Sequence, residues 1–137
     1  MGVLNDSAMD YIADSAKGKI YENTKSSMNL AANISSFTLG ASVELPPGVY
    51  VIAGRLSFGS TSGSASAINV ALGTSASNIY SESEQRIYQT ASWWTVTCTT
   101  AIVSLKTTTK VYVMGACTLA RSGCSSYIKA IKIWGGS

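Results

Sequence analysis

The stretch PPGVYVIAGRLSF, residues 46–58, decides the fold class of this 137-residue chain. Pro46, Pro47 and Gly48 predict a turn, because proline fixes φ and glycine accepts positive φ. After the turn, large apolar side chains recur at every second position, which is the period of a β-strand with one buried face. This face holds Tyr50, Ile52, Leu56 and Phe58. Gly54 interrupts the alternation and marks either a bulge or a close approach of another strand.

The same period continues through most of the chain that follows. Short apolar segments alternate with turns rich in Gly, Ser and Thr, and together they predict about eight strands. Strands of this length and spacing favour an all-β sandwich, jelly roll or barrel. Hydrophobic residues make up 46% of the chain, enough for a core, whereas charged residues make up only 12%. Residues 34–137 are therefore predicted to form one antiparallel β-domain.

Residues 110–120 are apolar on both faces of the predicted strand. One face holds Val111, Val113, Cys117 and Leu119, and the other holds Tyr112, Met114 and Ala116. Such a pattern is typical of a central strand, or of a strand with one face in the core and the other in a subunit contact. We expect Tyr112 and Met114 to contact a second subunit.

The N-terminal part has a different pattern. Residues 5–17 predict a helix, with small apolar residues at helical spacing and Met9 and Ile12 as its largest. A lone helix of this length is marginal in water, so it needs a surface to pack on. This surface is either the β-domain of its own chain or, as favoured, a sister subunit or another protein to which the helix anchors the chain. Residues 20–33 are polar and are interpreted as an irregular linker, so residues 1–33 form an anchor and linker. The first ten residues lack a signal-peptide pattern and no apolar run is long enough to span a membrane, which predicts a product made in the cytoplasm without membrane insertion.

Enzymatic function is disfavoured by what the chain lacks. It contains no histidine, which removes the Ser-His-Asp and Cys-His arrangements. Glu82 and Glu84 are two residues apart and are expected on one strand face, not across a cleft from each other. We therefore expect no catalytic residue, no metal site and no cofactor. Basic residues are scattered singly, which disfavours nucleic-acid binding.

The three cysteines have two interpretations. Cys117 and Cys124 flank a predicted hairpin loop and could form a disulfide. Alternatively, all three are free thiols, because Cys98 and Cys117 lie within apolar strand segments, where cysteine packs as a small apolar residue. The second interpretation is favoured.

Aromatic residues give the strongest indication of binding. Trp93 and Trp94 are adjacent, so on a strand they point to opposite faces. Both can be buried, one in the core and one in an oligomer interface. Alternatively, one is exposed near Arg86 and Tyr88, where it would stack on a sugar ring while the polar groups bind hydroxyls.

Three motifs carry a family resemblance. The segments ELPPGVYVI (44–52), VYV (111–113) and YIKAIKI (127–133) resemble the jelly-roll domains of complement and tumour-necrosis-factor type, which also occur as heads of phage tail-fibre, head-fibre and baseplate proteins. The resemblance implies an antiparallel jelly-roll sandwich and a homotrimer that buries one sheet at its threefold axis. It also implies loops that face a receptor, often a host-surface saccharide.

The leading hypothesis is therefore a trimeric virion structural protein, with its N-terminal segment bound to other virion proteins. The alternatives are a stand-alone carbohydrate-binding module and, less favoured, a polysaccharide-degrading enzyme that uses Glu82 and Glu84.

Overall fold

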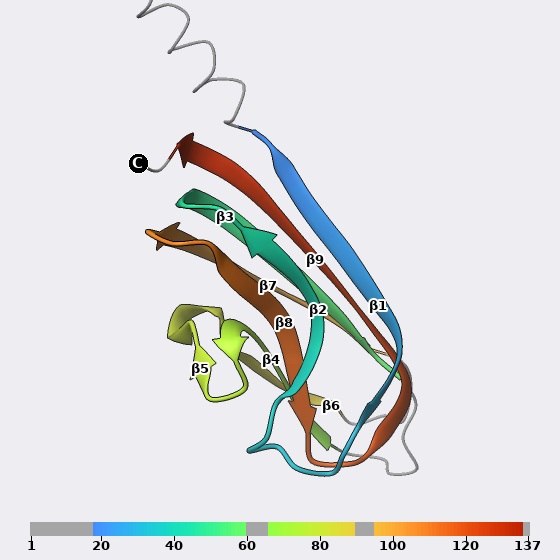
Figure 1. The fold of residues 1–137 in the computed structure, drawn as a ribbon. Coiled ribbons are helices and arrows are strands. Elements are labelled where there is room, and N and C mark those ends of the chain that lie inside the picture. Colours follow the sequence, from blue (N-terminus) through green and yellow to red (C-terminus); the bar gives the residue numbers. More distant parts are fainter. Residues whose placement is uncertain (1–17, 60–65, 90–94, 136–137) are drawn as a thin grey trace, which may run out of the picture.

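The computed structural model describes residues 18–59, 66–89 and 95–135, which form two facing antiparallel sheets (Figure 1). Sheet A has the order β1-β9-β3-β7. Its strands are β1 (Ile20–Leu30), β9 (Arg121–Gly135), β3 (Gly48–Phe58) and β7 (Thr95–Leu105). Sheet B has the order β2-β8-β4, followed at its edge by β5 and β6. Its strands are β2 (Thr38–Leu45), β8 (Thr109–Cys117), β4 (Ser66–Ser75), β5 (Asn78–Ile79) and β6 (Gln85–Gln89).

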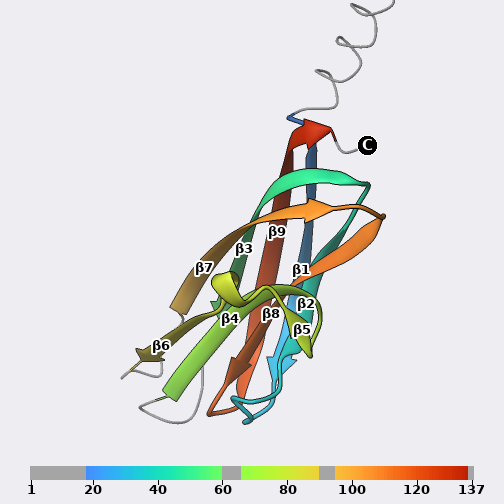
Figure 2. The same cartoon turned by 90° about the vertical axis from the view of Figure 1, so that its left-hand side faces the viewer.

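The connections between strands make this sandwich a jelly roll. The chain passes from one sheet to the other at nearly every turn, and β5 and β6 act as one strand. Both pair with β4, and the 3-10 helix η1 (Ser81–Ser83) interrupts them. Counted this way, eight strands form two four-stranded sheets, the arrangement typical of a jelly roll. The predicted all-β jelly-roll sandwich is confirmed (Figure 2).

The face of β3 that the sequence indicates is the centre of the core. Tyr50, Ile52, Leu56 and Phe58 are each fully buried. Gly54 marks a close approach, because a Cβ placed there would lie 2.8 Å from Cγ2 of Val113 in the opposite sheet. Pairing of β3 with β7 runs without a register shift from Gly48 to Phe58, so the alternative of a bulge at Gly54 is wrong.

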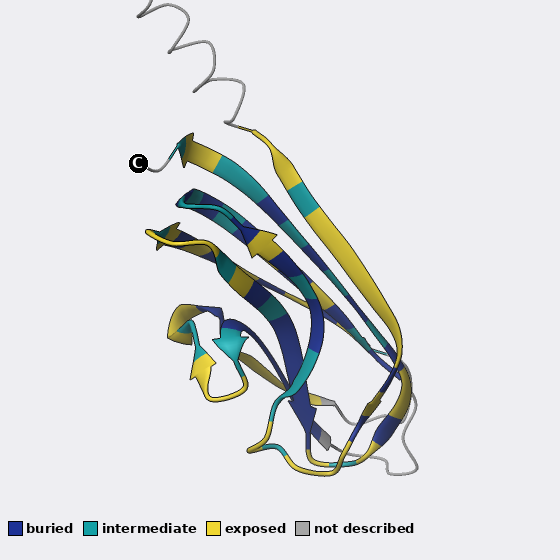
Figure 3. Cartoon of the chain, in the orientation of Figure 1, coloured by how far each residue is buried: buried dark blue, intermediate teal, exposed yellow. Residues whose placement is uncertain are grey.

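The predicted linker is wrong for most of its length. Ile20–Leu30 forms β1, which pairs with β9 and is part of the sandwich, so the β-domain extends N-terminally beyond residue 34. Its polar composition follows from its place at the edge of sheet A, where Met28 and Leu30 are buried and most other side chains are exposed (Figure 3). The predicted helix at residues 5–17, with Met9 and Ile12, lies outside the described residues.

A local irregularity in β1 lets its last residues reach the core. The register with β9 shifts between Lys25 and Met28, and Ser27 has a φ of 58°. This is the left-handed region, which is unfavourable for a residue with a Cβ. The bulge turns Met28 inward, where its sulfur accepts a hydrogen bond from the Ser126 hydroxyl at 3.3 Å.

Candidate functional site: the outer faces of the sandwich

The outer face of sheet B is already buried at its centre. Residues of β8 alternate, with Val111 and Val113 in the core and Met114 and Ala116 on the opposite face. Met114 is 0% exposed and Ala116 is 1% exposed within a single chain. The predicted central position of this strand is confirmed, because β8 lies between β2 and β4. The expectation that Met114 contacts another subunit is wrong, because the side chain has no surface to offer; Tyr112 is half-buried.

The outer face of sheet A is open and carries an apolar row across all four strands. Ile20 of β1 pairs with Ile131 of β9, Ile131 pairs with Val51 of β3, and Val51 pairs with Ile102 of β7. Directly paired residues point to the same face of a sheet, so the four side chains lie side by side. Ile20 is 49% exposed and Ile102 is 66% exposed. We call these four residues the apolar row.

Further apolar groups lie next to the apolar row. Trp134 pairs with Val49, which is two residues from Val51 along β3 and points to the same face. Trp134 is 60% exposed and Ile133 is 44% exposed. Single exposed apolar residues are ordinary, whereas a contiguous group marks an interaction surface. Sequence reasoning missed this surface, because its members come from four strands and only the register brings them together.

The next rows of the same face are polar and carry charges of both signs. Lys129 pairs with Glu22, and Arg55 pairs with Tyr127. The Arg55 guanidinium lies 5.4 Å from the centre of the Tyr127 ring. The Tyr127 hydroxyl donates a hydrogen bond to Glu22, and this bond raises the pKa of Tyr127. The outer face of sheet A is thus apolar at one end and charged beyond it.

Arg86 and Tyr88 lie on β6, at the edge of sheet B. Arg86 pairs with Asn69 of β4 and Tyr88 with Ala67, so both side chains point to the outer face of this sheet. Tyr88 is 80% exposed. Asn69 is 1% exposed, and its Nδ2 donates to Oε2 of Glu84 at 2.7 Å. Trp93 and Trp94 lie outside the described residues.

The two glutamates are not arranged as expected. Glu82 lies in η1, whereas Glu84 follows this helix and is extended. The two carboxylates therefore do not share one strand face.

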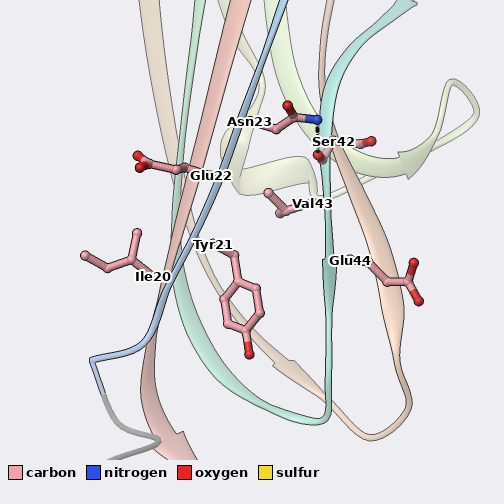
Figure 4. A pocket seen from close by; sticks show the side chains of 7 residues that line it. All are labelled: Ile20, Tyr21, Glu22, Asn23, Ser42, Val43 and Glu44. Carbon is pink, nitrogen blue, oxygen red and sulfur yellow. Dashed lines mark hydrogen bonds between the residues drawn. The ribbon is translucent and has the colours of Figure 1, made fainter.

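A groove of about 440 Å³ lies between the edge strands β1 and β2 (Figure 4). Tyr21 and Val43 point into it, while the carboxylates of Glu22 and Glu44 point away (Figure 4). Nδ2 of Asn23 donates to the Ser42 carbonyl oxygen at 3.1 Å across the groove. With both acids directed outward, the groove has no paired carboxylates for hydrolysis.

All three cysteines are free thiols, as favoured from the sequence. Cys117 and Cys124 are buried in the core, and burial raises the pKa of both. The expectation that Cys98 packs as an apolar residue is wrong: it is exposed and pairs with Arg55 on the outer face of sheet A. Cys98 is therefore an accessible thiol on the same face as the apolar row.

The described part of the chain gives no sign of a metal site or a membrane-spanning helix. No group of three His, Cys, Asp or Glu side chains there could hold a metal ion. No helix in those ranges has the length and apolar character needed to cross a bilayer.

Comparison with known proteins supports the fold. No family model and no curated protein matches the sequence. Among solved structures, the PRD1 vertex protein P5 aligns over 85% of this chain and 98% of its own, with a TM-score of 0.50 and 13% identity. The chain has the fold of this vertex protein.

Other similar structures score slightly lower. The globular domain of zebrafish complement 1qA aligns over 84% of this chain and 97% of its own, with a TM-score of 0.48 and 12% identity. A structure of infectious bursal disease virus, Gt strain, aligns over 85% of this chain with a TM-score of 0.49 and 8% identity. This chain spans only 33% of that viral chain.

Proposed function

We propose that this chain is a structural subunit of a virion and that it assembles as a homotrimer through the outer face of sheet A. The apolar row is the observation that carries the proposal. Exposed apolar surface is unfavourable in water by roughly 25 cal/mol for each Å², and in this row the cost recurs on four adjacent strands. A partner that covers the row removes this cost.

The charges beside the row favour another copy of the same chain as the partner. Glu22, Lys129 and Arg55 place both signs of charge on one face. A face that carries both signs can bring opposite charges together when copies of it meet around a symmetry axis. The resemblance to complement-type and tumour-necrosis-factor-like domains favours threefold symmetry.

Location in a virion is supported by two independent features. The sequence motifs resemble phage fibre and baseplate heads, and the fold is shared with a viral vertex protein. In this proposal the N-terminal segment binds other virion proteins, and host-surface saccharide is the receptor. We also propose that the chain is not an enzyme, since it contains no histidine.

Size-exclusion chromatography with light scattering tests the assembly. The expected mass is three times the 14.3 kDa of one chain. A clean monomer at micromolar concentration would contradict the trimer. Presence of the chain in purified particles, detected by mass spectrometry, tests its place in the virion.

A stand-alone carbohydrate-binding module is the second candidate. The exposed Tyr88 and Arg86 on β6 favour it, because an exposed aromatic ring next to hydrogen-bond donors suits a sugar. A monomer that binds glycan and is absent from particles would support this candidate over the first.

A further inference from the structure

Glu84, Arg86 and Tyr88 form a line on the outer side of the β6 edge. Each is two residues from the next, and Glu84 has an extended backbone, with φ −72° and ψ 124°. Side chains at this spacing point to the same side of a strand. With about 3.3 Å for each residue, the line is roughly 13 Å long. All three side chains are exposed, so the line is open to a ligand from solvent.

Asn69 holds the Glu84 carboxylate in place. The buried Asn69 amide donates to one carboxylate oxygen at 2.7 Å, which leaves the other oxygen to accept a bond from a ligand. Within the described part of the chain, Oδ1 of Asn69 is buried without a hydrogen-bond partner. Native proteins leave few buried polar atoms unpaired, so a buried asparagine at this position needs a reason. Orientation of the Glu84 carboxylate by its Nδ2 group provides this reason.

The groups in this line differ in what they offer. Glu84 accepts hydrogen bonds, and the Arg86 guanidinium donates them. Among the described residues neither side chain forms an ion pair, so both are available to a ligand. The Tyr88 ring is 80% exposed and presents a flat apolar surface.

This combination of groups selects a class of ligand. A sugar hydroxyl both donates and accepts, so neighbouring hydroxyls can bind an acceptor and a donor placed side by side. The apolar face of a pyranose ring suits the tyrosine ring. One acid and one base cancel in charge, so the line has no net attraction for an ionic ligand.

We infer that Glu84, Arg86 and Tyr88 bind a neutral saccharide along the β6 edge, with Asn69 as a positioning residue. The inference rests on the saccharide-binding part of the proposed function and names its site and its ligand class. The site lies at the edge of sheet B, whereas the proposed subunit contact covers sheet A. Assembly and saccharide binding can therefore be tested independently.

The experiment uses the full chain and three immobilised probes: maltotriose and chitotriose, which are neutral, and trigalacturonate, which is acidic. Binding to at least one neutral probe is expected, with no preference for the acidic one. Tyr88→Ala and Arg86→Ala should each weaken binding about tenfold or more, which corresponds to ~1.4 kcal/mol. Tyr88→Phe should retain most of the binding, because the ring remains.

Controls separate the site from general effects. Lys106→Ala removes an exposed positive charge far from β6 in sequence and should leave binding unchanged. Thermal unfolding should show that every variant is folded. Asn69→Ala should weaken binding. Nitration of Tyr88 should proceed as in the wild type, which would show that this tyrosine is still exposed in the variant.

Several outcomes overturn the inference. The first is that neither neutral probe binds, and the second is that only trigalacturonate binds. The third is that Tyr88→Ala retains full binding while Trp93→Ala or Trp94→Ala abolishes it. Light scattering on the same samples distinguishes the two proposals. A monomer that binds maltotriose contradicts only the trimer, and a trimer that binds neither neutral probe contradicts only this site.

Discussion

Val51 and Ile102 are direct neighbours across the β3–β7 pair, and both project from the outer face of sheet A. Ile102 is 66% exposed, although it lies on a long and regular strand. The regular pairing of β7 with β3 does not explain an apolar residue at this exposed position, whereas a subunit contact does.

Replacement of Ile102 by lysine should break the assembly. A buried isoleucine contributes about 1.5–3 kcal/mol, and a lysine in its place would bring an unpaired charge into each subunit contact. Light scattering should therefore show a monomer for Ile102→Lys. Thr108→Lys, in the exposed turn before β8, is the matched control and should keep the wild-type mass. An unchanged mass for Ile102→Lys would rule out this face as the interface.

Cys98 should report whether the outer face of sheet A is covered. In Ile102→Lys a thiol reagent such as DTNB should react rapidly with one cysteine for each chain, because only Cys98 of the three is exposed. In the assembled wild type the reaction should be slower. Cys117 and Cys124 should react only after unfolding, because burial raises the pKa of each thiol and the thiolate is the reactive form. Rapid native labelling of Cys98→Ser would contradict this assignment.

Replacement of Gly54 by alanine should destabilise the fold. The added Cβ would lie 2.8 Å from Val113 and 2.9 Å from Leu72, both buried in the opposite sheet. Overpacking of this kind typically costs about 1–3 kcal/mol, measurable as a lower urea midpoint. Gly135→Ala is the control, since a Cβ there meets nothing within 4 Å. Equal midpoints for the two variants would show that the sheets can separate at Gly54 at no cost.

Replacement of Ser27 by glycine should stabilise the fold. Ser27 has a φ of 58°, and a residue with a Cβ pays about 1–2 kcal/mol in this region. Part of the gain is lost because glycine is more flexible in the unfolded chain. Thermal unfolding should show a higher midpoint for Ser27→Gly and none of this gain for the neighbouring Ser26→Gly. A lower midpoint for Ser27→Gly would mean that the serine contributes more to β1 than its backbone costs.

Stability should fall in alkaline solution through Tyr50. Burial, and then the neighbouring Tyr21, raise its pKa from 10.0 to about 12. Below pH 10 Tyr50 is protonated in both the folded and the unfolded chain, so its contribution is complete. Between about pH 10 and 12 the unfolded chain loses this proton first, and the free energy of unfolding decreases.

Tyr50→Phe isolates this effect. The variant loses the hydrogen bond from the Tyr50 hydroxyl to the Pro46 carbonyl oxygen, at 2.7 Å, and should be about 1 kcal/mol less stable at neutral pH. Its decline above pH 10 should be shallower than that of the wild type. The free energy of unfolding can be measured by urea unfolding at several pH values between 9 and 11. An equally steep decline with pH in the wild type and in Tyr50→Phe would contradict the role of Tyr50.

The sequence predicts the sandwich well where apolar alternation is strong. The buried face of β3 follows from period two, whereas apolar residues on both faces of β8 favour its central position. The pattern does not reveal β1, because an edge strand with few buried side chains resembles a polar linker. Pairing with β9 stabilises this strand, and no local pattern encodes that pairing.

The candidate surfaces are harder to predict from sequence. The second apolar face of β8 is real, but the chain itself buries Met114, so the free apolar face lies on the other sheet. The apolar row combines residues more than 100 positions apart, from Ile20 to Ile131. The sequence indicates Arg86 and Tyr88 but not Asn69, because a buried asparagine in an apolar strand has no sequence signature.

The start of β1 and the end of β9 lie side by side (Figure 1). The Gly18 amide donates to the Lys132 carbonyl oxygen at 2.5 Å, and the Lys132 amide donates to the Lys19 carbonyl oxygen at 3.0 Å. A short peptide could therefore join these two points, and new termini could be opened in a turn at the far end of the sandwich. The same geometry would allow residues 18–135 to be inserted as a guest into a surface loop of a host protein. Such an insertion would separate the two halves of the host loop very little.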